Sequence, residues 1–244
     1  MTQENRSWAL LIGLLVLLAG GRPVDAQQNV RVPVEQDGRT VQLAAQLFRP
    51  AGGAAPAVAI FHGCGGPGQN TARMAGLLRD WGYVALVVDS FSSRGLTDVC
   101  GRNWPSQGDA EKRAPDIDAA LQWLAGQSYV DAKRLAFMGY SYGGGVAMLR
   151  ALAPQAVNAA PIARAAILVY PDCALADALG PKLAVRQPTL FAMGALDDWT
   201  PVSQCQAVIG RVAQGRDLVE TRIYDGAASS GLPDSARSIA TPPP

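Results

Sequence analysis

The chain has 244 residues, of which 49% are hydrophobic, so it is long enough to bury the core of one sizeable domain. Lysine and arginine number 21 and the acidic residues 20, which leaves a net charge of +1. A charge this close to zero argues against a nucleic-acid-binding protein or a protein with a cationic membrane-binding face. A small molecule is therefore the expected partner.

The first segment, residues 1–26, has the pattern of an export signal. Arg6 supplies a positive start, the apolar run "WALLIGLLVLLA" follows, and the small residues "VDA" precede Gln27. The apolar run is shorter than the roughly 18 residues that a membrane span needs, which favours cleavage over a retained anchor. The sequence thus predicts a secreted or periplasmic protein that has no membrane contact after cleavage.

The rest of the chain alternates strand-like and helical patterns. A hairpin is expected first, because Asp37-Gly38 between alternating apolar residues favours a two-residue turn. Six more strands are predicted at 57–62, 83–88, 134–139, 165–170, 188–194 and 217–224. Helical spacing of apolar residues occurs at 71–81, 109–126, 142–153 and 201–214. This alternation predicts a mostly parallel eight-stranded sheet with helices on both faces, in one domain at 27–228.

In two segments the apolar residues follow neither helical nor strand-like spacing. Residues 90–106 make a long connection at the carboxyl end of a predicted strand, which is typical of a lid or binding loop. Arg94 and Arg102 in this loop are candidates for holding a substrate carboxylate. The other segment, 229–244, ends in "TPPP" and is expected to be a loosely ordered tail.

The strongest local signal is "GYSYGGG", at residues 139–145. An apolar strand leads into it and a helical pattern leads out, which is the context that a G-x-S-x-G nucleophile turn requires. Such a turn holds the serine in a strained conformation above the sheet, and the helix N-terminus behind it favours developing negative charge. Ser141 is therefore the candidate nucleophile, and a role as a simple helix cap is the alternative.

A second signal is "FHGCGGPG", at residues 61–68, directly after the first buried strand. A glycine-rich turn here leaves backbone N–H groups free to face an oxyanion. The Cys64 amide would partner the Tyr142 amide across the site. His62 is expected to orient this loop rather than to carry protons, and a plain turn is the alternative interpretation.

The third signal is "GALDDWTP", at residues 194–201. Thr200-Pro201 is a typical helix start, which leaves Asp197 on the loop beyond the carboxyl end of a strand. Ligand sites of parallel sheets lie at that edge. Asp197 is thus the candidate catalytic acid, against the alternative of a capping or solvated aspartate.

Together these motifs resemble the dienelactone hydrolase family of the α/β-hydrolase superfamily. "FHGCGG" is similar to the oxyanion loop of that family, "GYSYGG" to its nucleophile turn and "GALDDWTP" to its acid loop. The resemblance covers nearly the whole chain after the export signal. It implies an α/β-hydrolase fold and hydrolysis of a small-molecule ester or lactone. Because the family typically carries a cysteine nucleophile, Ser141 points to general ester chemistry in an exported branch.

The family places its catalytic histidine on the loop after the last strand, in a pattern similar to Y-x-G-A-x-H. Tyr224, Gly226 and Ala227 fit this pattern, and Ser229 occupies the position of the histidine. A serine hydroxyl is no base at pH 7. The sequence therefore predicts a nucleophile and an acid without their base.

Three explanations of the missing histidine stay open. The protein could be a non-catalytic small-molecule binder on the same scaffold. Alternatively, a shift of reading frame near Ala228 would produce the abrupt departure of the tail from the family. A base could also come from another group, such as His62 or the substrate.

Four cysteines are expected to form two disulfides in an oxidising compartment. Cys64 and Cys100 lie on loops after neighbouring strands, while Cys173 follows a strand and Cys205 lies in the helix after the acid loop. We predict the pairs Cys64–Cys100 and Cys173–Cys205. No C-x-x-C pair occurs and the chain has one histidine, so neither a metal site nor a cofactor is expected.

Overall fold

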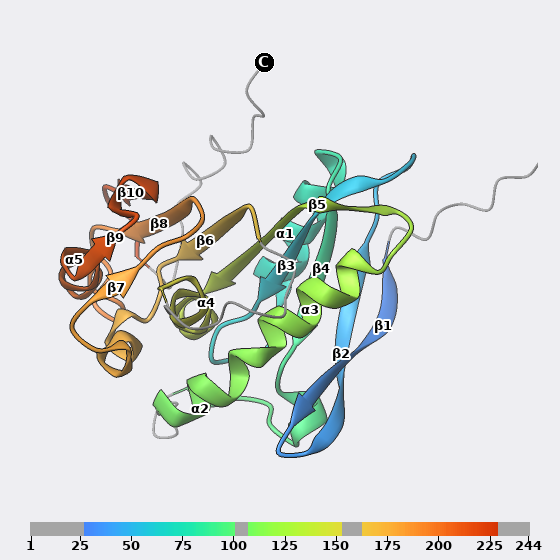
Figure 1. Cartoon of the computed structure of the whole chain (residues 1–244), viewed down its shortest axis with the longest axis horizontal. Coiled ribbons are helices and arrows are strands. Elements are labelled where there is room, and N and C mark those ends of the chain that lie inside the picture. The colour runs from blue at the N-terminus through green and yellow to red at the C-terminus, as the bar shows by residue number, and fades with distance from the viewer. Residues whose placement is uncertain (1–26, 101–106, 153–162, 229–244) are drawn as a thin grey trace, which may run out of the picture.

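The computed structural model describes residues 27–100, 107–152 and 163–228. Its main element is an eight-stranded sheet in the order β1-β2-β4-β3-β5-β6-β8-β10 (Figure 1). The strands are β1 Gln28–Gln36, β2 Arg39–Phe48, β3 Ala55–Phe61, β4 Val84–Asp89, β5 Val130–Tyr140, β6 Ala165–Val169, β8 Thr189–Gly194 and β10 Val219–Tyr224. β2 runs antiparallel to β1 and β4, and every other neighbouring pair is parallel. The predicted sheet and its strand number are confirmed.

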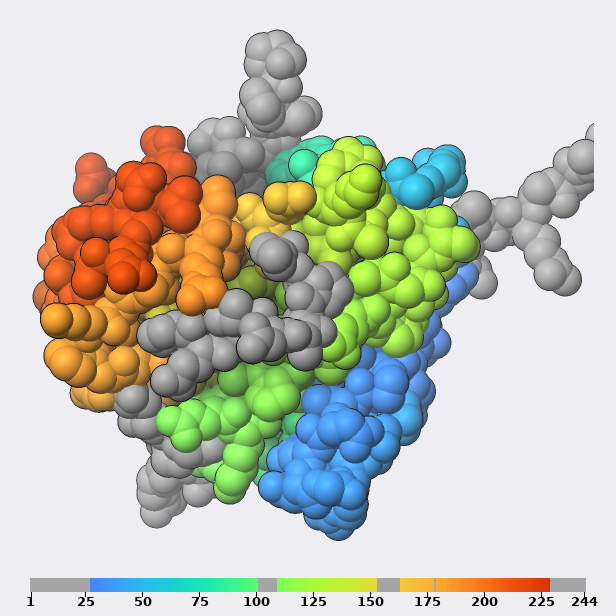
Figure 2. Space-filling model, viewed as in Figure 1, coloured from blue at the N-terminus to red at the C-terminus, as the bar shows by residue number. Residues whose placement is uncertain are grey.

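Helices cover both faces of this sheet. They are α1 Gln69–Asp80, α2 Gln107–Arg113, α3 Pro115–Ala125, α4 Tyr142–Leu152 and α5 Val202–Gly210, with short 3-10 turns at η1 Ser92–Arg94, η3 Cys173–Leu179 and η4 Arg216–Leu218. α1 packs on one face, whereas α3, α4 and α5 pack on the other. Figure 2 shows α2 and α3 beside the β1–β2 hairpin on that second face, with α5 and β10 at the opposite end.

The core has two parts because successive residues of a strand point to opposite faces. In β3, Ala59 and Phe61 join the larger cluster under α3 and α4. Val58 and Ile60 join the smaller cluster under α1. Strands buried on both faces read as continuous apolar runs, which is why the central strands are so visible in the sequence.

The hairpin turn is confirmed. Asp37 and Gly38 have φ of 50° and 71°, the two left-handed residues of a type I′ turn. Both predicted disulfides are also confirmed, with Cα–Cα distances of 5.1 Å for Cys64–Cys100 and 5.1 Å for Cys173–Cys205. In the described ranges, no helix has the length and apolar character needed to cross a membrane.

Two helix predictions are wrong in their extent. The pattern at 109–126 is split at Ala114, because Pro115 has no N–H to continue a helix and begins α3 instead. The pattern at 201–214 ends at Gly210, and Val212–Gln214 forms β9, which pairs with β7, Leu183–Ala184. The predicted export signal, the predicted tail, Arg102 and Ser229 lie outside the described residues.

Candidate active site

Ser141 stands at the sharp turn between β5 and α4. Its φ of 52° lies in the left-handed region, which is strained for a residue other than glycine. Backbone hydrogen bonds hold the turn from two sides. The Ser141 N–H donates to Val169 O at 3.0 Å, and the Ser141 carbonyl accepts from the N–H groups of Gly145 at 2.9 Å and Asp172 at 3.0 Å. The strain is thus maintained by β6 and by the loop that follows it.

Glycines around Ser141 allow backbone segments to touch. A Cβ at Gly139 would lie 2.1 Å from the carbonyl oxygen of Gly143, and one at Gly143 would lie 2.2 Å from that of His62. No side chain fits at such distances. Gly143 therefore lets the start of α4 pack directly against the end of β3, where the loop of residues 63–68 begins.

The loop of residues 63–68 lies beside the serine. A Cβ at Gly63 would be 3.4 Å from Ser141 Cβ and 3.9 Å from its Oγ. The Tyr142 amide belongs to the first turn of α4, where N–H groups have no partner within the helix. Within the described parts of the chain, the amides of Cys64 and Tyr142 have no hydrogen-bond acceptor. The arrangement can thus place two backbone donors near the serine hydroxyl.

His62 is fully buried, and both ring nitrogens have partners. Nε2 accepts from the Ser90 N–H at 3.2 Å, which leaves Nδ1 as the donor to the Gly63 carbonyl at 2.7 Å. Burial, aided by the charge of Arg113, lowers the pKa of His62 to about 3. The ring is therefore neutral at physiological pH. Its contacts favour the structural role that the sequence suggests over the alternative of a general base.

Arg113 is a buried residue that sequence reasoning missed. Its Nη2 donates to the His62 carbonyl at 2.9 Å, and its guanidinium lies 5.2 Å from the ring centroids of Phe91 and Tyr142. Within the described residues, its Nε and Nη1 are buried without a hydrogen-bond partner. The Arg113 side chain lines a cavity of about 190 Å³, together with Tyr142 and Lys112. An arginine at the end of an amphipathic helix is normally predicted to lie on the surface. The Ala-Pro break that follows Arg113 is the one sequence signal against that prediction.

Asp197 is buried on the loop between β8 and α5. Its Oδ1 accepts from the N–H groups of Trp199 at 3.0 Å and Thr200 at 2.9 Å, and its Oδ2 accepts from Thr200 Oγ1 at 2.8 Å. Thr200, which the sequence identifies as a helix start, thus orients the carboxylate. The loop lies beyond the carboxyl end of β8, as predicted.

The chain leaving β10 returns to this acid loop. The Leu196 N–H donates to Ala227 O at 2.9 Å, and a Cβ at Gly194 would lie 2.3 Å from that same oxygen. Leu196 precedes Asp197 directly. Two residues before position 229, the backbone is therefore fixed against the loop that carries the candidate acid.

Arg94 is bound within the protein. Its Nη1 and Nη2 donate to both carboxylate oxygens of the buried Asp116, at 2.9 and 2.7 Å. Its Nε donates to Gln36 Oε1 at 2.9 Å, and Nη1 also donates to Ser90 O at 2.7 Å. These contacts favour a structural role for Arg94, fastening η1 to the hairpin and to α3, over the carboxylate-binding role suggested by the sequence.

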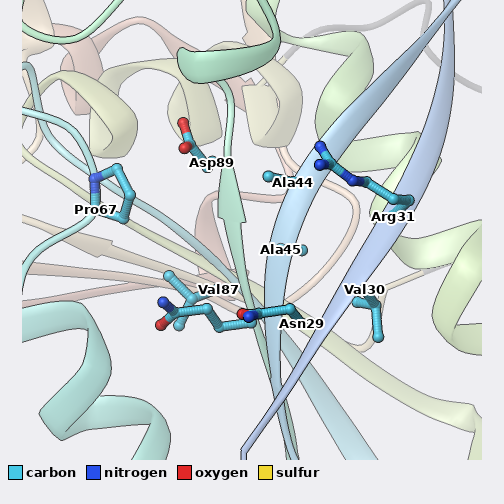
Figure 3. Close-up of a pocket in the computed structure, with 9 residues that line it drawn as sticks. Asn29, Val30, Arg31, Ala44, Ala45, Pro67, Val87 and Asp89 are labelled. Carbon is cyan, nitrogen blue, oxygen red and sulfur yellow. The ribbon is translucent and has the colours of Figure 1, made fainter.

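A separate pocket of about 320 Å³ lies over β1, β2 and β4. Figure 3 shows Pro67 and Asp89 near one end of it and Asn29 and Val30 near the other. Its lining comes from the hairpin side of the sheet and includes neither Ser141 nor the acid loop. The pocket therefore touches the loop of residues 63–68 at Pro67 but is not lined by the candidate nucleophile or acid.

Comparison with known sequences identifies relatives along most of the chain. The model of the "Dienelactone hydrolase family" matches residues 43–239. An uncharacterised protein of Mycobacterium tuberculosis is 31% identical over 184 residues, which are 69% of this chain and 62% of that protein. The chain thus spans less than two thirds of that relative. A probable 2-oxo-3-(5-oxofuran-2-ylidene)propanoate lactonase of Bradyrhizobium is 29% identical over 75% of this chain and 76% of its own length.

Solved structures share the fold. Dienelactone hydrolase from Anabaena variabilis superimposes with a TM-score of 0.65 at 20% identity, covering 88% of this chain and 94% of its own. A dienelactone hydrolase-like promiscuous phosphotriesterase from metagenomic libraries gives 0.61 at 21% identity, covering 89% of each chain. Esterase 2 of Thermogutta terrifontis, phosphorylated by paraoxon, gives 0.61 at 17% identity over 84% of this chain and 85% of its own. The α/β-hydrolase architecture is therefore confirmed.

Proposed function

The chain belongs to the dienelactone hydrolase family, and we propose that it hydrolyses carboxylic esters or lactones slowly, with Ser141 as nucleophile, Asp197 as acid and no histidine base. One observation carries the proposal: Ser141 sits at a left-handed turn beside Gly63, where an added Cβ would lie 3.4 Å from Ser141 Cβ. The turn and the loop of residues 63–68 together fit a tetrahedral intermediate whose oxyanion accepts from two backbone amides.

The chemical step follows from this arrangement. Ser141 Oγ adds to the ester carbonyl carbon, and the carbonyl oxygen takes the negative charge between the amides of Cys64 and Tyr142. The alcohol then leaves with the serine proton, and water cleaves the acyl-serine ester to release the acid. Serine hydrolases without their triad keep about 10³- to 10⁴-fold acceleration over water from the oxyanion hole and binding. That remainder does not need the nucleophile, so we expect the rate of this chain to lie above it and the excess to depend on Ser141.

The alternative is a small-molecule binder that does not turn over its ligand. In a complete triad the acid orients the histidine. The Asp197 carboxylate instead accepts three hydrogen bonds from its own loop, which is the observation that supports a binder. The two proposals differ in one respect, since only the enzyme forms a covalent bond through Ser141.

The preferred substrate would carry a carboxylate. Arg113 and Lys112 line the cavity beside Tyr142, and two nitrogens of the Arg113 side chain are buried without a partner among the described residues, while Asp109 is the acidic lining residue that opposes an anion. Buried N–H groups without acceptors favour a negatively charged ligand oxygen. We expect a half-ester with a free carboxylate to have a KM at least about 10-fold below that of the matched neutral diester. Equal KM values would remove this preference.

The test of the main proposal uses p-nitrophenyl acetate and the variant Ser141→Ala. We expect a slow release of p-nitrophenol that saturates with substrate and falls in Ser141→Ala to the rate that the oxyanion hole and binding supply without a nucleophile. Paraoxon supplies a second readout, because phosphorylation of Ser141 is seen by peptide mass mapping even where turnover is slow. Saturable binding without either reaction would favour the binder. The same slow rate in the wild type and Ser141→Ala would contradict the assignment of the nucleophile.

The site of action is proposed to be an oxidising compartment. Two disulfides in one small domain are typical of exported proteins. This agrees with the export signal predicted for residues 1–26.

A further inference from the structure

The loop of residues 63–68 has almost no side chains with which to fix itself. Its sequence is Gly-Cys-Gly-Gly-Pro-Gly, so only Cys64 and Pro67 carry side-chain atoms. Glycine loses more backbone freedom on folding than any other residue, and a loop of this composition is costly to order. A donor amide in the loop can be presented accurately only if the loop is anchored.

The anchor is the disulfide from Cys64 to Cys100. Next to it, the Val99 N–H donates to the Cys64 carbonyl at 2.9 Å. Gly66, at φ 81°, packs so closely that a Cβ would lie 3.1 Å from Thr97 O. The glycine-rich loop therefore rests on residues 97–100 and is covalently fixed to them at Cys64.

The start of the loop is held separately. Arg113 Nη2 binds the His62 carbonyl at 2.9 Å, and Gly63 packs against Ser141. These contacts fix the entry of the loop but not the Cys64 amide, which is one residue further. Within the described residues, the disulfide to Cys100 is the covalent link to Cys64, whose amide is the proposed donor.

We propose that the Cys64–Cys100 disulfide positions the oxyanion hole, so that its loss lowers turnover by releasing the Cys64 amide from the site. The inference rests on the proposed function of Ser141. Cys100 touches neither substrate nor the reacting atoms and acts through Cys64, which makes it a positioning residue.

The same bond is the more accessible of the two disulfides. Cys64 is 8% exposed and Cys100 is half-buried, whereas Cys173 is 2% and Cys205 0% exposed. Thiol exchange requires the attacking thiolate to reach a sulfur. Dithiothreitol would therefore reduce Cys64–Cys100 first, converting the disulfide to two thiols while the dithiol closes to its own cyclic disulfide.

The second disulfide supplies a matched control. The double variants Cys64→Ser/Cys100→Ser and Cys173→Ser/Cys205→Ser each remove one cross-link, over sequence separations of 36 and 32 residues. Serine at 64 keeps the backbone N–H. We expect the first variant to lose about 10- to 100-fold in kcat with KM changed less than about 3-fold, and the second to keep most of its kcat. Equal kcat losses in both would overturn the proposal.

Hydrogen exchange supplies a readout that does not depend on turnover. We expect amide exchange in the peptide covering residues 62–68 to accelerate when Cys64–Cys100 is absent and to stay unchanged when Cys173–Cys205 is absent. Folded wild-type protein treated with dithiothreitol provides the same comparison if a variant fails to fold. Unchanged exchange in both cases would overturn the positioning role. A Ser141-independent rate combined with accelerated exchange would instead overturn only the proposed function.

Discussion

The candidate site has two halves, one around Ser141 and one around Asp197. Close backbone contacts hold both halves, but the side chains that follow them differ. In the half around Ser141, the proposed nucleophile half, glycine contacts bring β3, β5 and α4 together so closely that Ser141 and the start of the loop of residues 63–68 have little freedom. In the acid half, Gly194 and Leu196 hold Ala227 just as closely against the loop of Asp197. The first half carries the proposed nucleophile Ser141, and in the sequence the second is followed by Ser229 at the position where the family places a histidine.

The backbone that forms the site and the side chains that would react in it are therefore specified separately. The close backbone contacts of the acid half hold Ala227 against the loop of Asp197. Rate, however, depends on the proton acceptor at that place. A protein can therefore retain the geometry of a hydrolase while losing most of its catalytic power through one side chain.

The largest expected effect compares one glycine from each half. Gly143→Ala places a Cβ 2.2 Å from the His62 carbonyl, whereas Gly226, at φ 73°, has no atom within 4 Å. We expect Gly143→Ala to cost more than about 4 kcal/mol in unfolding free energy or to prevent folding, and Gly226→Ala to cost about 1 kcal/mol. Urea unfolding followed by circular dichroism would measure both. Similar small losses would mean that the nucleophile half is much less rigid than its contacts indicate.

The next effect concerns the two cross-links. Because the closed segments span 36 and 32 residues, the two disulfides should contribute almost equally to stability, about 4 kcal/mol each by loop-closure entropy. Calorimetry of the two double cysteine-to-serine variants would therefore show similar losses, even where their kcat values differ. A much larger loss in the Cys64/Cys100 variant would attribute its loss of activity to unfolding rather than to positioning.

The third effect is the pH dependence that His62 gives to the nucleophile half. Its pKa in the folded protein is about 3, below its ordinary value of 6.5, so the unfolded chain takes up a proton that the folded chain refuses. The resulting stability is present above pH 6.5 and is lost as the pH falls toward 3. We expect a loss of about 2 kcal/mol between pH 7 and pH 5.

His62→Gln is the control for this titration. His62 is the one histidine in the sequence, so the variant should show a nearly flat stability between pH 5 and pH 7 even if it is less stable overall. Asp89, whose pKa is lowered by hydrogen bonds from Ser92 and Phe91 that outweigh its burial, titrates below this window. A wild-type slope that persists in His62→Gln would refute the assignment.

The smallest effect lies in the acid half. Thr200→Val removes the hydroxyl that donates to Asp197 Oδ2 at 2.8 Å while keeping the shape of the side chain. A hydrogen bond to a charged carboxylate is worth about 1.5 kcal/mol or somewhat more. We expect a loss of that size in unfolding free energy, with Ser141-dependent activity within about 2-fold of the wild type, because in the proposed mechanism the carboxylate has no histidine to orient. A large loss of activity would indicate that Asp197 already serves an unidentified base.

Much of the fold could be predicted because its signals are local. Asp37-Gly38 dictates a hairpin turn, and the strands buried on both faces appear as apolar runs. The ends of the helices and strands are harder to predict. Val212–Gln214 continues the helical pattern of α5, and only its pairing with Leu183–Ala184 makes it a strand. Pairings of so few residues depend on tertiary contacts that no local pattern reveals.

The site shows the same limit. The serine turn, the glycine-rich loop and the acid loop are short motifs whose spacing reflects the backbone they need. Arg113 and the Arg94–Asp116 pair depend instead on helices folding against distant loops. A charged residue is usually solvated, so apart from the Ala-Pro break beside Arg113 the sequence does not distinguish these arginines from surface ones.

The central claim is that the site lacks only its base, and Ser229→His tests it most directly. The histidine would follow Ala227, whose carbonyl is already fixed to Leu196 beside Asp197. Steady-state hydrolysis of p-nitrophenyl acetate should rise by about 10²-fold or more in Ser229→His, and the gain should vanish in Ser229→His/Ser141→Ala. An unchanged rate in folded Ser229→His, or a gain that survives removal of Ser141, would contradict the account.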